Sequence, residues 1–213
     1  MAAAQQSQGV VEFNDKEKVA IAEAINEAQN QLASNNAKAS QEQLVLVAGT
    51  MKNVQVRPLM LSKTHDWEGH FVASPPERLP GAGSTSAGST IGAFIHEGAT
   101  SLGSGPIVLP MVVGSKAAIV YDTFDKMYPG LGYLLAWYKP ENHANGISKV
   151  YVEAGNSSRL RKMDWKEIEE KLDASGSRSR YWDSDTGAAA AAEIKNHGEK
   201  AALIGAMFDR FQE

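Results

Sequence analysis

Residues 133–155 read Tyr133-Leu-Leu-Ala-Trp-Tyr-Lys-Pro-Glu-Asn-His-Ala-Asn-Gly-Ile-Ser-Lys-Val-Tyr-Val-Glu-Ala-Gly155. The segment contains two strand candidates rich in Tyr, Trp, Leu and Val, joined by a loop of Pro, Asn, His and Gly. Strands of this composition bury one face, so the loop is held beside a rigid sheet. The two strands predict a β fold. The loop is a candidate binding loop, because Tyr138, Pro140 and His143 offer both apolar and polar atoms.

Short apolar runs separated by Gly, Ser, Pro or Asp turns continue on both sides of this segment. They predict a mainly β domain, built as an antiparallel sandwich or barrel. The runs are residues 43–49, 54–61, 91–96, 107–113, 116–121, 133–138 and 149–153.

The C-terminal segment gives two conflicting signals. Residues 188–192 and 201–208 have strong helix propensity. The residues between them, Asn196, His197 and Gly198, have the composition of a hairpin turn. Because the surrounding segments are strands, we expect two more strands here.

Two helices accompany the strands. The first is expected over residues 14–35, where Asn14 and Glu17 form a capping box and apolar residues recur at helical spacing. The second is expected over residues 164–175, with Asp164 as its N-cap. The prediction is therefore a β domain flanked by two helices.

The first helix has two interpretations. About 20 residues at ~1.5 Å each would reach across a hydrocarbon core, which would suit a membrane-inserting arm. However, Asp15, Glu17, Glu23 and Glu27 crowd its polar face, which membrane-surface helices usually make basic. We therefore expect a helix packed on the body of the domain.

Composition indicates a globular chain with a single domain. Of its 213 residues, 43% are hydrophobic and 22% charged, which is sufficient for a buried core. We expect a flexible N-terminus over residues 1–13 and one β-sandwich domain over residues 14–213. The absence of cysteine excludes disulfides and thiolate catalysis, and it fits a reducing compartment.

Charge and hydropathy limit the partners. A formal net charge of −4 argues against nucleic acid, whose phosphates are bound by clustered Lys and Arg. The N-terminus has neither a basic nor an apolar segment, so no signal peptide is readable, and no apolar run approaches the ~18 residues of a spanning helix. We expect a soluble protein, cytoplasmic or released by a non-classical route, with only peripheral membrane contact.

His65, Asp66 and Trp67 stand together and raise the question of catalysis or metal binding. A His-Asp pair needs a nucleophile, and the chain has no Gly-x-Ser-x-Gly elbow. The spacing of His65 and His70 matches no common metal-ligand pattern. We therefore expect neither an enzyme nor a bound metal or cofactor.

Four sequence blocks follow one another in a fixed order along the chain. They are His65-Asp66-Trp67-x-Gly69-His70, Gly92-Ala93-Phe94-Ile95-His96, Ala117-Ala118-Ile119-Val120-Tyr121 and Leu135-Ala136-Trp137-x-x-Pro140. This series resembles the plant jasmonate-induced protein family from residue 53 to the C-terminus. More remotely, residues 134–172 are similar to the actinoporins in their order of strand, aromatic residue, Pro, polar loop, strand, Gly and short helix.

The resemblance implies both a fold and a ligand. The implied fold is an actinoporin-like antiparallel β-sandwich flanked by two α-helices. The implied ligand is sphingomyelin, with cholesterol, at a membrane surface, and Tyr138 and Pro140 fall on the strand and loop of the headgroup site. The loop over residues 141–146 is more polar than in actinoporins, so we expect lipid binding with little or no pore formation.

The residue chemistry is compatible with a phosphocholine headgroup. Aromatic faces attract a quaternary ammonium, and Trp67, Trp137 and Tyr138 carry such faces. His65, Asp66 and His143 offer hydrogen bonds to the polar groups of the lipid. Trp165 is either a core residue or a ligand contact. The candidate site residues are therefore His65, Asp66, Trp67, Trp137, Tyr138, Pro140, His143 and Trp165.

Three functional classes stay open on the residues alone. A lipid-binding module predicts binding that depends on sphingomyelin, and a lectin-like module predicts competition by free sugars at the same Trp, Asp and Asn side chains. A hydrolase predicts turnover that is lost when His65 or Asp66 is changed. The sequence favours a binding module, and the preference for lipid over sugar rests on the resemblance.

Overall fold

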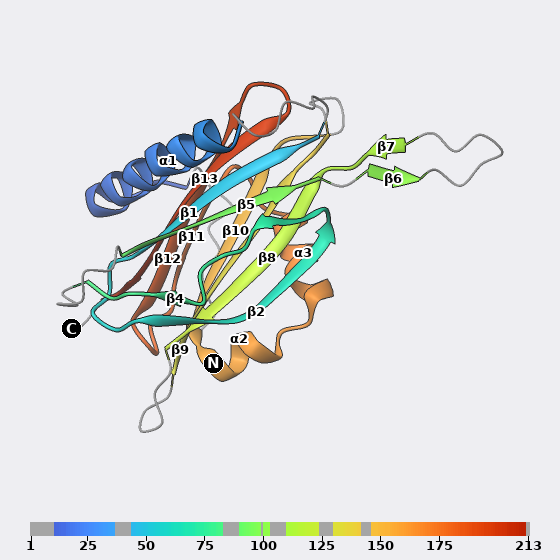
Figure 1. Cartoon of the computed structure of the whole chain (residues 1–213). Coiled ribbons are helices and arrows are strands. Elements are labelled where there is room, and N and C mark those ends of the chain that lie inside the picture. The colour runs from blue at the N-terminus through green and yellow to red at the C-terminus, as the bar shows by residue number, and fades with distance from the viewer. Residues whose placement is uncertain are drawn as a thin grey trace.

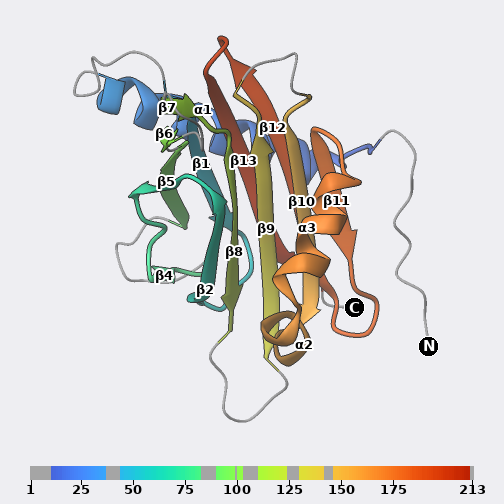
Figure 2. The same ribbon diagram turned by 90° about the vertical axis from the view of Figure 1, so that its right-hand side faces the viewer.

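The chain forms two β-sheets packed face to face, with helices on both outer faces (Figure 1). The computed structural model describes residues 11–36, 44–82, 90–98, 100–102, 110–123, 130–141 and 146–211. Figure 2 shows the two layers after a quarter turn. A β-sandwich with flanking helices, as predicted, is confirmed.

Each sheet has a defined strand order. The first sheet runs β11 (Arg178–Trp182), β12 (Ala188–His197), β13 (Ala201–Arg210), β1 (Leu46–Asn53), β5 (Ile91–Glu97) and β3 (His70–Ala73). The second runs β10 (Lys149–Asn156), β9 (Leu131–Lys139), β8 (Ser115–Asp122), β2 (Leu59–Glu68) and β4 (Arg78–Leu79). A separate pair, β6 (Thr100–Leu102) and β7 (Pro110–Val112), projects from the body (Figure 1).

One strand pair departs from the antiparallel pattern. β1 runs parallel to β13, with Leu46 opposite Ala201 and Asn53 opposite Phe208. These two strands are about 150 residues apart in sequence, so no hairpin turn forces them to run in opposite directions. All other described pairs are antiparallel, including the β12–β13 hairpin that the sequence predicts.

The space between the sheets is filled mostly by aliphatic side chains, and the largest side chains within it are aromatic. Trp137 of β9 stacks on Phe94 of β5, with ring centroids 4.7 Å apart and an angle of 27° between the planes. Tyr133 packs on Phe208 across the sandwich at 5.2 Å, and its hydroxyl donates to the Asp209 carbonyl oxygen at 2.9 Å. These contacts join β9 of the second sheet to β5 and β13 of the first.

The N-terminal helix α1 (Asp15–Asn36) packs on the outer face of the first sheet (Figure 1). Its capping box is confirmed, because the Glu17 amide donates to Asn14 Oδ1 at 2.9 Å and the Asn14 amide donates to Glu17 Oε2 at 2.8 Å. Gly205 of β13 permits the close approach, since a Cβ there would lie 2.6 Å from the Ile21 carbonyl oxygen. The packed interpretation of the first helix is therefore the observed one.

Ion pairs fasten α1 further. Arg180 of β11 holds Glu17, whose side chain is 1% exposed, at 2.7 Å, and Lys16 contacts Asp209 at 2.5 Å. Glu23 pairs with Lys52 of β1. Among the described residues, no helix is both long and apolar enough to cross a membrane.

Two short helices cover the outer face of the second sheet (Figure 2). They are α2 (Ser157–Lys162) and α3 (Trp165–Asp173). The Asp164 cap of α3 is confirmed by a 3.0 Å hydrogen bond from the Lys166 amide, whereas the sequence did not predict α2. Leu160, Ile168 and Leu172 pack these helices on β8 and β9, so the central strands are buried on both faces.

Strand boundaries differ from the prediction at several points. Residues 54–58 connect β1 to β2 rather than forming a strand, because Pro58 offers no amide hydrogen and Asn53 Nδ2 donates to the Arg57 carbonyl oxygen at 2.9 Å. β2 then extends to Glu68, so His65, Asp66 and Trp67 lie within a strand and not after one. β11 was not predicted.

Some expectations concern residues outside the described ranges. Residues 1–10 of the expected flexible terminus, residues 107–109 of an expected strand, and His143 fall there. Phe13, at the end of the expected flexible segment, is buried with the residues that pack α1 on the first sheet.

Candidate functional site

Three aromatic rings meet on the outer face of the second sheet. His65 of β2 stacks on Trp165 of α3, with centroids 4.7 Å apart and planes 10° apart. Trp67, two residues further along β2, meets the His65 ring edge-on at 4.9 Å and the Trp165 ring at 6.2 Å. Side chains two residues apart on a strand share a face, so β2 brings His65 and Trp67 to the start of α3.

Tyr138 of β9 lies on the same face, beside Trp67. The ammonium of Lys116 on β8 connects them, because Nζ lies 5.9 Å from the Trp67 ring and 5.5 Å from the Tyr138 ring. Trp67, Tyr138 and Trp165 are half-buried against the residues under α2 and α3. We call His65, Trp67, Tyr138 and Trp165 the outer aromatic cluster.

Lys116 is fully engaged within the protein. Its ammonium donates to Glu169 Oε1 at 2.7 Å and to Asp173 Oδ1 at 3.0 Å, both on α3. Burial alone would lower the pKa of Lys116, but the hydrogen bonds to Glu169 and Asp173 outweigh it and raise the pKa. Lys116 therefore joins α3 to β8 as a group that is charged near neutral pH.

Lys63 is the second cation of this face, and its surroundings are different. Its ammonium lies 4.0 Å from the Trp165 ring centroid and donates to the Met163 carbonyl oxygen at 3.1 Å. Burial lowers the pKa of Lys63, and the Asp164 carboxylate opposes that shift. No described carboxylate forms a salt bridge with Lys63, so hydrogen-bonding capacity remains on its ammonium.

A second polar arrangement lies on the inner side of the same strands. His96 Nε2 is 3.2 Å from Asp66 Oδ1, and His96 Nδ1 is 2.8 Å from Ser115 Oγ. The Trp137 indole Nε1 donates to the same Ser115 oxygen at 3.1 Å. We call Asp66, His96, Ser115 and Trp137 the inner hydrogen-bond chain.

The inner hydrogen-bond chain has one consistent proton assignment. Because the Trp137 indole can only donate, Ser115 Oγ accepts a hydrogen bond from it and its hydroxyl donates one to His96 Nδ1. His96 Nε2–H then donates to Asp66. Burial lowers the pKa of His96 to about 4, although Asp66 acts to raise it, so the imidazole is neutral near pH 7. The order resembles a Ser-His-Asp triad, but Ser115 is completely buried and its oxygen is out of reach of a substrate.

A glycine at the corner between the two sheets permits the close packing around His96. Gly69, with a φ of 93°, turns the chain from β2 of the second sheet into β3 of the first. A Cβ there would lie 2.2 Å from the Glu97 carbonyl oxygen and 2.8 Å from His96 Cε1. Only glycine permits both the turn and the close approach to His96.

The eight predicted site residues therefore divide into two groups. The structure brings together His65, Trp67, Tyr138 and Trp165 as the outer aromatic cluster. The others are placed elsewhere: Asp66 and Trp137 face the inner side, Pro140 is buried at the end of β9, and His143 lies outside the described residues. The expectation that Trp137 offers its face to a ligand is not met, because the ring is completely buried between Phe94, Phe71 and His96.

Sequence reasoning missed Lys63 and Lys116. The alternation Lys63-x-His65-x-Trp67 would have placed Lys63 on the face of the aromatic residues, had this segment been recognised as a strand. Lys116 gave no comparable signal, because β8 is buried on both faces and shows no alternation.

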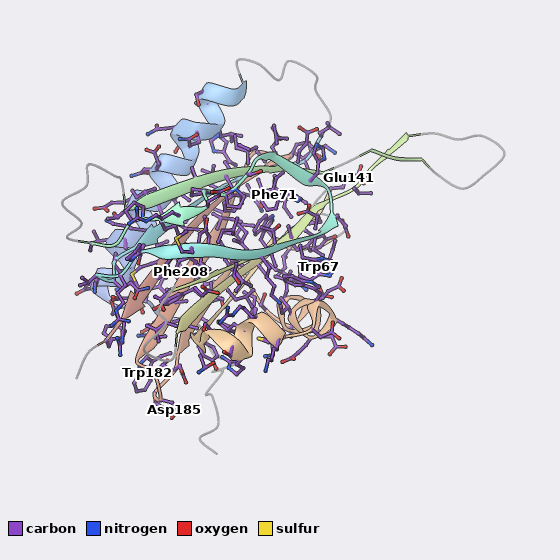
Figure 3. The ribbon with its side chains drawn as sticks, turned by 60° about the horizontal axis from the view of Figure 1, so that its bottom comes forward. Trp67, Phe71, Glu141, Trp182, Asp185 and Phe208 are labelled. Atoms are coloured by element: carbon purple, nitrogen blue, oxygen red, sulfur yellow. The ribbon has the colours of Figure 1, made fainter. Side chains whose placement is uncertain are left out.

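The outer aromatic cluster occupies one part of the surface only. Figure 3 shows Trp67 beside α3 toward one end of the sandwich and Trp182 with Asp185 at the opposite end. Trp182 of β11 is 56% exposed. It is therefore a natural control for any role assigned to Trp67 or Trp165.

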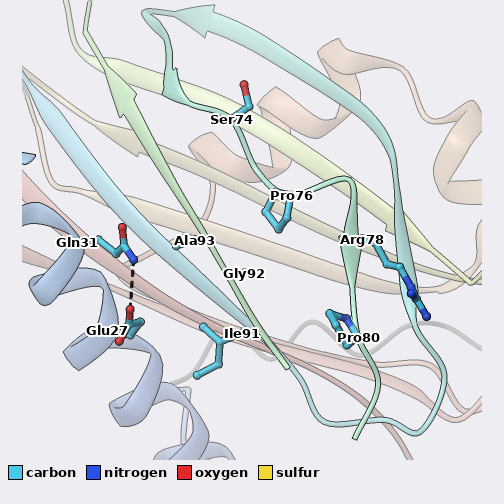
Figure 4. Close-up of a pocket in the computed structure, with 9 residues that line it drawn as sticks. All are labelled: Glu27, Gln31, Ser74, Pro76, Arg78, Pro80, Ile91, Gly92 and Ala93. Atoms are coloured by element: carbon cyan, nitrogen blue, oxygen red, sulfur yellow. Dashed lines mark hydrogen bonds between the residues drawn. The ribbon is translucent and has the colours of Figure 1, made fainter. Parts of the chain in front are cut away.

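A separate groove lies between α1 and the β4–β5 region (Figure 4). Its volume is about 540 Å³, and the residues that line it are Glu27, Gln31, Ser74, Pro76, Arg78, Pro80, Ile91, Gly92 and Ala93. None of these carries an aromatic ring, so the groove has no platform on which a sugar or a quaternary ammonium would stack. Within the described part of the chain, no group of three or more His, Asp or Glu side chains is placed to hold a metal ion.

Comparison with known proteins agrees with the resemblance read from the sequence blocks. No family model matches the chain. A curated relative, the jasmonate-induced protein homolog of Atriplex canescens, is 28% identical over 152 residues, covering 70% of this chain and 72% of the relative. The resemblance to the jasmonate-induced protein family is thereby confirmed.

Two solved structures are similar in shape. The crystal structure of the lipid binding protein Nakanori superposes with a TM-score of 0.61 at 22% identity, over 96% of this chain and 91% of that protein. The lectin XCL of Xerocomus chrysenteron gives a TM-score of 0.43 at 7% identity, over 79% of this chain and 99% of the lectin, which is too low to assign a shared fold. The likeness to Nakanori confirms the fold.

Proposed function

We propose that this protein binds lipids at a membrane surface and that the outer aromatic cluster contacts the headgroup. The observation that carries the proposal is the meeting of His65, Trp67 and Trp165, which lie on elements about 100 residues apart and remain partly exposed. Aromatic side chains with a polar atom are favoured at membrane interfaces, where one end is apolar and the other hydrated.

Sphingomyelin together with cholesterol is the proposed target. The sequence resemblance supports this choice, and Nakanori, which has a similar fold, is a lipid binding protein. The headgroup of sphingomyelin is zwitterionic, so a chain with a formal net charge of −4 meets no net repulsion from it. The imidazole of His65 and the ammonium of Lys63 supply hydrogen bonds beside the rings.

We propose further that binding produces little or no pore formation. Pore formation by α1 would require the helix to leave the first sheet. That step would break the Glu17–Arg180 and Lys16–Asp209 ion pairs, and it would leave the buried carboxylate of Asp209 without its lysine partner. A buried polar group left without its partner costs about 1–3 kcal/mol.

Sedimentation with vesicles tests the lipid proposal. We expect the protein to pellet with vesicles of sphingomyelin and cholesterol at least about tenfold more strongly than with vesicles of phosphatidylcholine and cholesterol. Sphingomyelin and phosphatidylcholine carry the same phosphocholine headgroup. Trp165→Ala should reduce pelleting about tenfold, which corresponds to ~1.4 kcal/mol. The matched control Trp182→Ala should not change it.

Three results would redirect the proposal. Equal pelleting with both vesicles would remove the preference for sphingomyelin, and dye release at saturating protein would overturn the absence of pores. No pelleting, combined with quenching of tryptophan fluorescence by free sugars, would replace lipid binding by the lectin-like alternative.

A further inference from the structure

The cation positions of the outer aromatic cluster are already occupied by the protein itself. The Lys116 ammonium lies within 6 Å of both the Trp67 and the Tyr138 ring, and the Lys63 ammonium lies 4.0 Å from the Trp165 ring. A cation over an aromatic face is stabilised by the ring quadrupole within about 6 Å. A choline group entering this cluster would therefore approach two ammonium groups that already hold the favourable positions.

The two lysines differ in what they can still bind. Lys116 donates to Glu169 and Asp173, and its side chain is only 9% exposed, so an incoming anion would meet two carboxylates. Lys63 donates only to the Met163 carbonyl oxygen among the described residues, and an ammonium has three hydrogens to donate. Among the described residues, the cluster therefore has an anion contact at Lys63, where Asp164 acts on the ammonium without a salt bridge, and no comparable vacancy for a cation.

We propose that, within the lipid site proposed above, Lys63 binds the phosphate, so that among sphingolipids the site selects those that carry a phosphate and does not recognise the methyl groups of choline. This inference rests on the proposed function. The ligand class accordingly includes ceramide phosphoethanolamine, which has the ceramide and the phosphate of sphingomyelin but a primary amine.

The surroundings of Lys63 favour a phosphate in three ways. The stacked rings of Trp165 and His65 limit the positions that the lysine stem can adopt, so little side-chain freedom is lost on binding. Partial burial strengthens a charge-assisted hydrogen bond to a phosphate oxygen. Burial also lowers the pKa of Lys63, and a neighbouring anion would offset that cost.

Vesicles that differ only in the sphingolipid test the proposal on the unaltered protein. Each vesicle contains cholesterol and one of sphingomyelin, ceramide phosphoethanolamine or glucosylceramide, the last of which has no phosphate. We expect the first two to bind within about threefold of each other, and glucosylceramide to bind at least about tenfold more weakly, as expected for the loss of a hydrogen bond to a charged group.

Variants of Lys63 test whether this residue is responsible for the preference for lipids that carry a phosphate. Lys63→Gln should weaken binding to both phosphate-bearing lipids about tenfold or more, and Lys63→Arg should retain most of it, because the guanidinium also binds phosphate. Lys18→Gln is the matched control, since it removes one positive charge from the exposed face of α1 on the opposite sheet. It should change binding less than about twofold.

The possible failures are distinguishable. Sphingomyelin binding that exceeds ceramide phosphoethanolamine binding by tenfold would show choline recognition and overturn this inference, while the proposed lipid function would stand. Unchanged binding by a folded Lys63→Gln variant would overturn it in the same way. Absence of binding to all three vesicles would overturn both proposals.

Discussion

Asp66 and Trp67 are neighbours on β2, and Trp137 and Tyr138 are neighbours on β9, yet each pair is divided between the two faces of the second sheet. Asp66 and Trp137 belong to the inner hydrogen-bond chain, whereas Trp67 and Tyr138 belong to the outer aromatic cluster. Adjacent residues of a strand point to opposite faces. Each pair therefore contributes one side chain to the stability of the sandwich and one to its surface.

The two regions also differ in how far their hydrogen bonds are satisfied. In the inner chain, the indole of Trp137, the hydroxyl of Ser115 and both nitrogens of His96 all have partners at 2.8–3.2 Å. In the outer cluster, the Lys63 ammonium keeps donors to spare. A closed network stabilises a fold, whereas a partly open one beside exposed rings is able to accept a ligand.

The largest expected effect is that of Trp137→Ala on stability. The ring is completely buried between Phe94 and His96, so its removal leaves a cavity and takes from Ser115 its indole donor. We expect the free energy of unfolding to fall by about 4 kcal/mol, as measured by urea denaturation. The matched control Trp182→Ala should change it by less than about 0.5 kcal/mol; equal losses would contradict the division into an inner and an outer region.

The next effect is a dependence of stability on pH that arises from His96. Its pKa is lowered from 6.5 to about 4 in the folded protein, so between these values the unfolded chain binds more protons than the folded one. The contribution of the neutral ring is fully present above pH 6.5 and is lost as the pH falls toward 4, at up to about 1.4 kcal/mol per unit.

A variant isolates this contribution. His96→Gln should lose less stability than the wild type between pH 6.5 and pH 4.5, as measured by urea denaturation at each pH. Asp66 and His70 also act on the His96 ring. The measured quantity is therefore the difference between wild type and His96→Gln in how the free energy of unfolding changes with pH. Identical slopes would show that His96 does not titrate in this way.

A smaller loss of stability than that of Trp137→Ala is expected for Trp67→Ala. Its ring is half-buried and packs on residues under α3, so we expect a loss of about 1–2 kcal/mol. Thermal unfolding of Trp67→Ala and Trp137→Ala under the same conditions measures the contrast. A loss as large as that of Trp137→Ala would place Trp67 in the structural core instead of the proposed binding surface.

Much of the fold could be predicted from the sequence, because it is encoded locally. The capping box of Asn14 and Glu17, the cap at Asp164 and the β12–β13 hairpin each depend on a few neighbouring residues, and the structure contains all three features. The hairpin turn lies at residues 198–200, two residues later than predicted, because Asn196 and His197 still pair within β12. The resemblance of the sequence blocks extended this local information to the whole sandwich. The face of each aromatic residue could not be predicted in the same way.

The reason lies in how the central strands are covered. α2 and α3 bury the outer face of β9, so residues on both of its faces are apolar and the sequence Leu-Leu-Ala-Trp-Tyr shows no alternation. Trp137 and Tyr138 are therefore equivalent in sequence, and only the pairing of β9 with its neighbours separates them. Lys63 was missed for a different reason, because residues 62–68 of β2 contain polar side chains that are typical of a loop.

The central claim is that the outer aromatic cluster, and not the opposite end of the sandwich, touches lipid. Quenching of tryptophan fluorescence by vesicles of sphingomyelin, cholesterol and a phosphatidylcholine brominated near the headgroup tests it directly. We predict that the wild type and Trp182→Phe are quenched, whereas the Trp67→Phe/Trp165→Phe double variant still sediments with the vesicles but loses the quenching. Quenching that persists in the double variant and disappears in Trp182→Phe would contradict the account.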